Sequence, residues 1–163
     1  MIKVIVKEIR DEDFTSYQKP SMVIAFPSCT FKCERECGQK MCQNSALMTA
    51  PDIEISVENI VDRYLKNPIT KAIIMAGLEP FDSLPSLHHL VKEFRRYTDD
   101  DIVIYTGYTE KELWIYPSTL TYLQRFPNII IKFGRFLPNK NPHYDEILGI
   151  KLASDNQYAR RIS

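Results

Sequence analysis

The stretch Met22-Val-Ile-Ala-Phe26-Pro-Ser-Cys29-Thr-Phe-Lys-Cys33 joins an apolar run to the first cysteines of the chain. A short run of bulky residues with no polar side chain is typical of a buried strand. Cys37 and Cys42 follow soon after, and the rest of the sequence holds no further cysteine. In parallel α/β folds the loops after the strands carry the chemistry. The stretch therefore predicts a functional site in the loop that follows a buried strand.

The sequence outside this stretch alternates between apolar, strand-like runs and helical patterns. Ser56 is expected to cap a helix that runs towards Leu65, with Asn59 in the capping-box position. Further strands are expected at 71–75, 101–105 and 129–133, and further helices at about 84–97, 110–114 and 118–126. Apolar strands separated by helices indicate a mainly parallel sheet in an α/β fold. Only about four or five βα units fit, which excludes a complete eight-unit barrel.

The bulk properties of the chain indicate one domain. We interpret residues 1–163 as a single domain with an N-terminal edge strand at about 1–10 and an irregular tail at about 138–163. The 21 basic and 21 acidic residues balance, so no long-range field attracts nucleic acid or a membrane surface. No apolar run approaches the roughly 20 residues of a membrane span, and the N-terminus lacks the layout of a signal peptide. We therefore expect a cytoplasmic protein.

The crowding of the cysteines favours a metal site over disulfide bonds. Thiols this close together in a cytoplasmic protein are typically metal ligands, because reducing compartments disfavour disulfides. Structural zinc sites usually take two ligand pairs separated by a dozen or more residues. An iron–sulfur cluster is larger and accepts thiolates from one folded loop. The spacing therefore favours an iron–sulfur cluster, with zinc as the alternative.

The motifs of the chain resemble those of a known enzyme family. Cys29-Thr-Phe-Lys-Cys33, with the later Cys42-Gln-Asn44, resembles the signature of radical S-adenosylmethionine (radical SAM) proteins, in which C-x3-C-x2-C binds a four-iron cluster. Within that family the chain is most similar to activating proteins of the anaerobic (class III) ribonucleoside-triphosphate reductase. Other segments that resemble family motifs follow in the same order: Ala76-Gly77-Leu78-Glu79-Pro80, Tyr105-Thr106-Gly107-Tyr108-Thr109, Phe133-Gly134-Arg135-Phe136 and Ser154-Asp-Asn156-Gln157.

The resemblance implies a fold and a set of cofactor ligands. The fold would be a partial (incomplete) βα barrel of the radical SAM type, holding a [4Fe-4S] cluster and S-adenosyl-L-methionine. The cluster ligands would be Cys29, Cys33 and Cys42, because Cys42 keeps the asparagine that follows it. Eight residues separate Cys33 from Cys42 where the family has two, and Cys37 lies among them as the alternative third ligand.

The resemblance also assigns the contacts to S-adenosylmethionine. The turn Gly77, Leu78, Glu79 and Pro80 would meet its methionine amino group, with the Glu79 carboxylate compensating the ammonium. Leu78 replaces a glycine of the family turn. The Thr106-Gly107 corner would contact the sugar or methionine moiety, and Asn44 would lie near the cluster. The alternatives are an ordinary turn with Glu79 in solvent, a corner that only needs the freedom of glycine, and an Asn44 that caps the next helix.

The activity implied by the resemblance is oxidoreductive activation of another protein. Reductive cleavage of S-adenosylmethionine would give a 5′-deoxyadenosyl radical that generates a glycyl radical on the anaerobic ribonucleoside-triphosphate reductase. A reduced flavodoxin- or ferredoxin-like protein would supply the electron. The alternatives are a radical SAM enzyme with another substrate and a non-catalytic iron–sulfur or zinc-binding protein.

Overall fold

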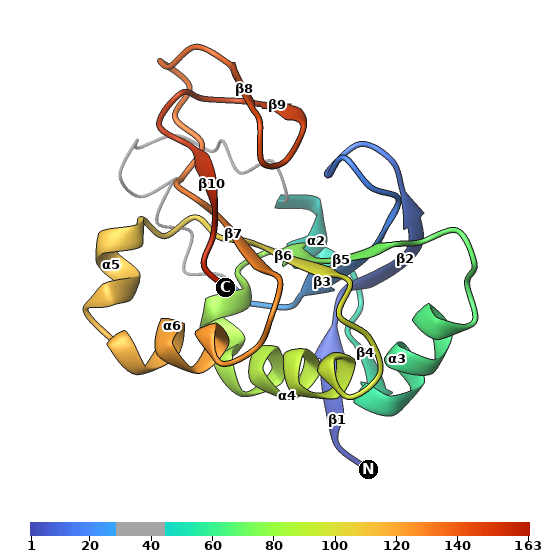
Figure 1. Cartoon of the computed structure of the whole chain (residues 1–163). Coiled ribbons are helices and arrows are strands. Elements are labelled where there is room, and N and C mark those ends of the chain that lie inside the picture. The colour runs from blue at the N-terminus through green and yellow to red at the C-terminus, as the bar shows by residue number, and fades with distance from the viewer. Residues whose placement is uncertain (29–44) are drawn as a thin grey trace.

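A mixed β-sheet organises the molecule. The computed structural model describes residues 1–28 and 45–163. Within these residues the main sheet has the strand order β10-β7-β6-β5-β3-β2 (Figure 1). The four inner strands are parallel to one another, and the edge strands β2 and β10 pair antiparallel to β3 and β7. The strands are β2 (Glu8–Asp13), β3 (Ser21–Phe26), β5 (Ala72–Gly77), β6 (Asp101–Tyr105), β7 (Ile129–Phe133) and β10 (Tyr158–Arg161).

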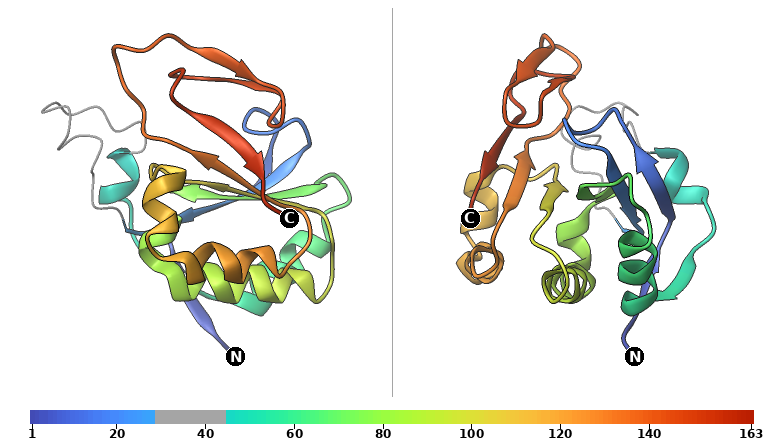
Figure 2. Two further views of the ribbon diagram at one scale, coloured as in Figure 1. Left: turned by 60° about the vertical axis from the view of Figure 1, so that its left-hand side comes forward. Right: turned by 45° about the vertical axis from the view of Figure 1, so that its right-hand side comes forward.

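Helices cover one face of this sheet. In the views of Figure 2, α4 and α6 lie side by side beneath the strands, with α3 beyond α4. This arrangement follows from the parallel inner strands, because each return to the start of the next strand needs a crossover. The helices are α2 (Ser45–Thr49), α3 (Val57–Leu65), α4 (Leu84–Arg95), α5 (Glu110–Trp114) and α6 (Pro117–Gln124), with the 3-10 turn η1 (Pro80–Ser83) before α4.

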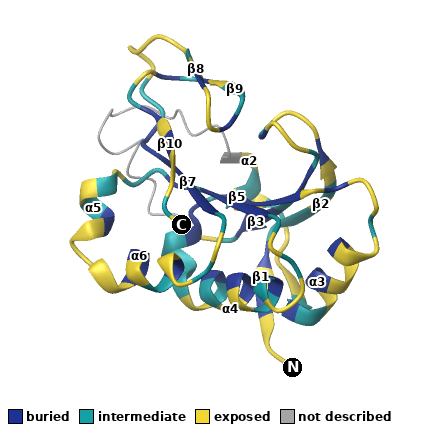
Figure 3. Cartoon of the chain, viewed as in Figure 1, coloured by how far each residue is buried: buried dark blue, intermediate teal, exposed yellow. Residues whose placement is uncertain are grey.

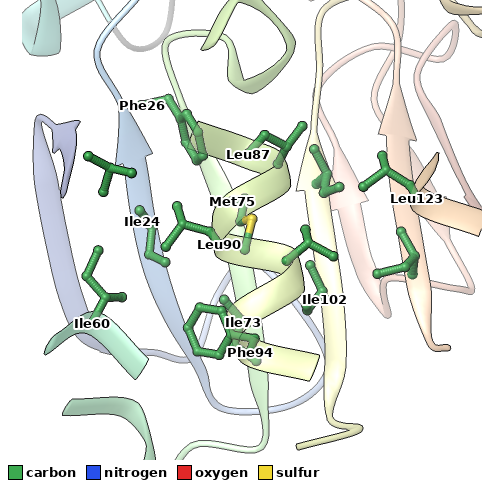
Figure 4. Packing of buried hydrophobic residues seen from close by; sticks show 14 of the residues in the cluster. Ile24, Phe26, Ile60, Ile73, Met75, Leu87, Leu90, Phe94, Ile102 and Leu123 are labelled. Carbon is green, nitrogen blue, oxygen red and sulfur yellow. The ribbon is translucent and has the colours of Figure 1, made fainter. Parts of the chain in front are cut away.

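The main core lies between the helices and the sheet. Leu87, Leu90 and Phe94 form the apolar stripe of α4 and are fully buried. They pack over Ile73 and Met75 of β5 (Figure 4). Burial of each such side chain stabilises the fold by roughly 1.5–3 kcal/mol. The helical spacing read from the sequence is therefore the spacing that builds this core.

The other face of the sheet is covered by the C-terminal segment. The hairpin of β8 (His143–Asp145) and β9 (Ile150–Leu152) lies above the strands, opposite the helices (Figure 1). Leu148 and Leu152 are buried in one cluster with Ile74, Val103 and Ile130, which are the strand residues that alternate with the main core. Nearly every residue of β5, β6 and β7 is buried, and Figure 3 colours the central strands accordingly. Burial on both faces explains why these strands read as continuous apolar runs.

The helix start expected at Ser56 is confirmed. Its side chain accepts a hydrogen bond of 3.1 Å from the Asn59 backbone N–H, and α3 ends at Leu65.

The N-terminal segment differs from the single edge strand that was expected. Strand β1 (Lys3–Val6) pairs antiparallel with β4 (Ile53–Ser56) in a separate two-stranded sheet, and only β2 forms an edge of the main sheet.

The tail is more regular than its sequence indicates. It contains β8, β9 and β10, which are three or four residues long and therefore too short to show a periodic pattern. No helix in residues 1–28 and 45–163 has the length and apolar character needed to cross a membrane.

Candidate functional site

The carboxyl ends of the parallel strands bring the motif segments together. The turn after β5 is bonded to the residues that follow β3: the Leu78 N–H donates to the Phe26 carbonyl at 3.2 Å, and the Glu79 N–H donates to the Ser28 carbonyl at 2.7 Å. Ser28 is the last described residue before Cys29. The expected cofactor turn therefore holds the backbone from which the cysteine run begins.

Gly77 allows this close approach. Its φ is +88°, in the left-handed region that L side chains rarely adopt. A Cβ atom at this position would lie 2.5 Å from the Phe26 backbone nitrogen. The glycine of the motif is thus required by the contact between β5 and β3, whatever ligand the turn receives.

The Glu79 side chain joins the turn after β5 to the corner after β6. Its carboxylate accepts hydrogen bonds from the Thr106 hydroxyl at 2.8 Å, the Gly107 N–H at 2.8 Å and the Phe81 N–H at 3.1 Å. Only 4% of the residue is exposed, so the alternative of a solvated Glu79 is wrong. Burial raises the pKa of Glu79 to about 7, opposed by these hydrogen bonds, which favour the charged form.

The Thr106-Gly107 corner lies beside the turn, and the expected cofactor residues Gly77, Leu78, Glu79, Pro80, Thr106 and Gly107 therefore share one edge of the sheet. Gly107 does not have a positive φ, in contrast to Gly77. A Cβ atom there would make only ordinary contacts, 3.6 Å from Glu79 Oε2 and 3.7 Å from Arg135 Cγ. The alternative that this corner needs the conformational freedom of glycine is therefore wrong.

A buried lysine that the sequence analysis did not identify lies at the same edge. Lys132, in β7, is 7% exposed, and its Nζ donates to the carbonyls of Gly134 at 2.9 Å and Thr106 at 3.4 Å. Burial lowers the pKa of Lys132 to about 8, and the charge of Glu79 opposes this shift. The available signal was a single lysine within the apolar strand Ile129-Ile-Ile-Lys-Phe133.

Two further side-chain pairs connect the strand-end turns. The Tyr108 hydroxyl donates to Asp82 Oδ1 at 2.5 Å, linking the corner to η1. Arg135 donates to both carboxylate oxygens of Glu112, at 2.7 and 2.9 Å, linking the end of β7 to α5. Glu112 also completes a capping box with Thr109 at the start of α5. The turns after β5, β6 and β7 thus form one hydrogen-bonded assembly.

The expected metal ligands lie outside the described residues. Cys29, Cys33, Cys42, the alternative ligand Cys37 and the cofactor residue Asn44 all fall within 29–44. Among residues 1–28 and 45–163, no cluster of three or more His, Cys, Asp or Glu side chains is arranged to hold a metal ion.

Comparison with known proteins identifies the family. No curated protein matches the sequence. Residues 21–152 match the family described as the 4Fe-4S single cluster domain. The match begins with β3 and includes the cysteine run, the turn after β5 and the corner after β6. Because it covers well over half of the chain, this protein belongs to the 4Fe-4S single cluster domain family.

Proposed function

We propose that this protein is a radical SAM activating enzyme that generates a glycyl radical on a partner protein, the anaerobic ribonucleoside-triphosphate reductase. The observation that carries the proposal is the bonding of the Gly77–Pro80 turn to both Ser28 and the Thr106-Gly107 corner. An iron–sulfur domain that only carries electrons has no need of such a turn. Family membership supports a [4Fe-4S] cluster over the zinc alternative.

The donor set fits the cofactors. Thiolates from Cys29, Cys33 and Cys42 would hold three irons and leave the fourth open, with Cys37 as the alternative third ligand. Held by these residues, the cluster would supply one electron, taken from a reduced flavodoxin- or ferredoxin-like donor, for cleavage of S-adenosylmethionine to methionine and a 5′-deoxyadenosyl radical, and that radical would take a hydrogen atom from the partner's glycine. Asn44, two residues after Cys42, would lie near this cluster.

The protein's own residues would bind and orient S-adenosylmethionine at the carboxyl edge of the sheet. An ionised carboxylate offers about four acceptor positions. Donors among residues 1–28 and 45–163 use three of them on Glu79, and the remaining position would accept from the ammonium of the methionine moiety. The hydrogen bonds of Thr106 and Gly107 to Glu79 keep the corner beside the turn, where it would face the same ligand.

The open sheet supports the expected partial βα barrel. The four parallel strands β3, β5, β6 and β7 would form its wall, with the helices outside. The sheet ends in the unpaired sides of β2 and β10 and does not close within the described residues. An open side would admit a peptide loop of a large partner. The glycyl radical protein is therefore a fitting macromolecular substrate.

The test is anaerobic reconstitution with iron and sulfide, followed by reduction and electron paramagnetic resonance with and without S-adenosylmethionine. We expect a four-iron signal that changes when S-adenosylmethionine is added, together with 5′-deoxyadenosine and methionine as products. The Cys29→Ala variant, treated in the same way, is the control. It should give no four-iron signal and no cleavage products. A cluster that assembles but is indifferent to S-adenosylmethionine would overturn the proposal and favour an electron carrier.

A second assay addresses the partner. The reduced, reconstituted protein is mixed with S-adenosylmethionine and the anaerobic reductase, and the doublet signal of a glycyl radical is sought. Cleavage of S-adenosylmethionine with no radical on the reductase would favour the alternative of a radical SAM enzyme with another substrate.

A further inference from the structure

The tail segment Ser154–Gln157 binds the turn that follows β7. The Gln157 Nε2 donates to the Gly134 carbonyl at 3.3 Å, and the Asn156 Nδ2 donates to the Arg135 carbonyl at 2.8 Å. The segment is itself fixed, because the Ser154 N–H donates to Gln157 Oε1 at 3.2 Å. Ser154 and Gln157 are 0% and 5% exposed. The buried Gln157 amide and the partly buried Asn156 amide therefore both bond to the backbone of the turn.

The same turn holds the expected cofactor corner. The Gly134 N–H donates to the Tyr108 carbonyl at 3.0 Å. The Gly134 carbonyl shares the Lys132 ammonium with the Thr106 carbonyl. Gly134 is thus bonded, directly and through Lys132, to the residues on both sides of Gly107. Gln157 reaches the Thr106-Gly107 corner through a single intervening residue.

The packing of the tail against Gly134 leaves little freedom. Gly134 has a φ of +102°, and a Cβ there would lie 3.1 Å from the Asn156 carbonyl oxygen and 3.3 Å from the Gln157 Cα. Strand β10 begins at the next residue, Tyr158, which is paired with Phe133. The backbone of the tail therefore packs closely against the backbone of the Gly134 turn, next to the point where β10 begins to pair with β7.

We propose that Gln157 and Asn156 are positioning residues for S-adenosylmethionine: they fix the Gly134 turn and, through it, the Thr106-Gly107 corner. The proposal rests on the proposed function for the identity of the ligand. It assigns to the C-terminal Ser154–Gln157 segment a role at the site without contact with the reacting atoms. The physical reason is that a corner held by hydrogen bonds on two sides loses less freedom on binding a ligand.

The first test needs no cofactor. Gln157→Met keeps the volume of the side chain and removes its hydrogen bonds, and Asn156→Ala removes the bond to Arg135 if Gln157→Met fails to fold. The matched control is Gln18→Met, because the Gln18 Nε2 donates at 3.0 Å to the Ile147 carbonyl, also in the tail but away from the corner. Hydrogen exchange of the metal-free proteins should show faster exchange at the amides of 106–108 in the Gln157 or Asn156 variant only. Unchanged exchange there would overturn the positioning role.

The second test measures affinity. Each protein is reconstituted anaerobically, its iron and sulfide are quantified, and S-adenosylmethionine binding is titrated calorimetrically. We expect full cluster content in every variant, and binding about three- to tenfold weaker in Gln157→Met, the effect of one hydrogen bond. Gln18→Met should bind as the wild type does.

The outcomes separate the two proposals. Equal affinity of Gln157→Met and the wild type, with S-adenosylmethionine bound by both, overturns only the role of the tail. A wild-type protein that assembles its cluster and does not bind S-adenosylmethionine overturns the proposed function and, with it, this inference.

Discussion

The Thr106 hydroxyl donates a 2.8 Å hydrogen bond to the Glu79 carboxylate and so joins the turns after two neighbouring parallel strands. Both residues are almost fully buried, at 2% and 4% exposure. In the interior a hydrogen bond of this kind matters mainly because a carboxylate left without its donor is costly. The pair, together with the Gly107 N–H bond to the same carboxylate, therefore holds the two motif segments together.

Thr106→Val removes the hydroxyl while keeping the shape of the side chain. We expect the free energy of unfolding to fall by about 1–3 kcal/mol, because a buried carboxylate loses a donor. Urea denaturation of the metal-free protein measures this change. The control is Thr49→Val, which removes an exposed hydroxyl bonded to the Ala46 carbonyl and should change stability by less than about 0.5 kcal/mol. Equal effects of the two substitutions would contradict the bridging role of Thr106.

Gly77→Ala should be far more damaging than Gly107→Ala. Gly77 combines a positive φ with a 2.5 Å approach of the added Cβ to Phe26, whereas Gly107 has neither feature. We expect a loss of more than about 2 kcal/mol of unfolding free energy for Gly77→Ala and about 0.5 kcal/mol or less for Gly107→Ala. Thermal and urea denaturation of both variants provide the comparison. A destabilised Gly107→Ala variant would indicate a tighter corner than the contacts describe.

Lys132 should make stability depend on pH in the alkaline range. Burial lowers the pKa of Lys132 in the folded protein to about 8, while the unfolded chain has the ordinary value near 10.5. The unfolded state therefore binds the proton more readily than the folded state does. The free energy of unfolding is thus highest above about pH 10.5 and falls as the pH is lowered to about 8. The loss is on the order of 3 kcal/mol relative to Lys132→Met, with no further change below pH 8.

The measurement is the difference in unfolding free energy between the wild type and Lys132→Met, by urea denaturation at several pH values from 7 to 10.5. Lys71→Met, which removes an exposed lysine, is the control and should follow the wild type. Parallel pH profiles for the wild type and Lys132→Met would show that Lys132 titrates in the folded protein as it does in the unfolded chain.

The two candidates for the third cluster ligand can be separated by mutation. Cys42→Ala should abolish cluster assembly, whereas Cys37→Ala should retain the cluster and the cleavage of S-adenosylmethionine. The reason is Asn44, two residues after Cys42, which resembles the asparagine that follows the third cysteine in the activating proteins named in the sequence analysis. Iron and acid-labile sulfide analysis with visible absorption of the reconstituted variants gives the answer. The reverse result would identify Cys29, Cys33 and Cys37 as the ligands.

The parallel part of the fold was predictable from sequence. Strands β6 and β7 and helix α5 begin and end where the pattern predicts, because apolar runs buried on both faces and a capped helix give strong local signals. The pairing of β1 with β4 was not predicted, since it joins segments about fifty residues apart through register alone.

The site was predictable in outline and less so in its chemistry. Strands expected at 71–75 and 101–105 in a parallel sheet end just before the Gly77–Pro80 turn and the Thr106-Gly107 corner, and the carboxyl ends of parallel strands meet at one edge. Nothing in the local pattern indicates that Glu79 is buried, that Lys132 bonds to the corner, or that Gln157 bonds to the Gly134 turn beside it. Those contacts depend on side chains from distant segments, and they leave no trace in local periodicity.

The two outer strands of the main sheet bear on solubility. An edge strand exposes unpaired backbone groups that can recruit another chain and start aggregation. Strand β2 reads Glu-Ile-Arg-Asp-Glu-Asp, and β10 ends in Arg160-Arg161. Charged side chains along an edge penalise the approach of a second strand, because pairing would strip them of water. The sheet can thus remain open at both edges without recruiting further copies of the chain to add to them.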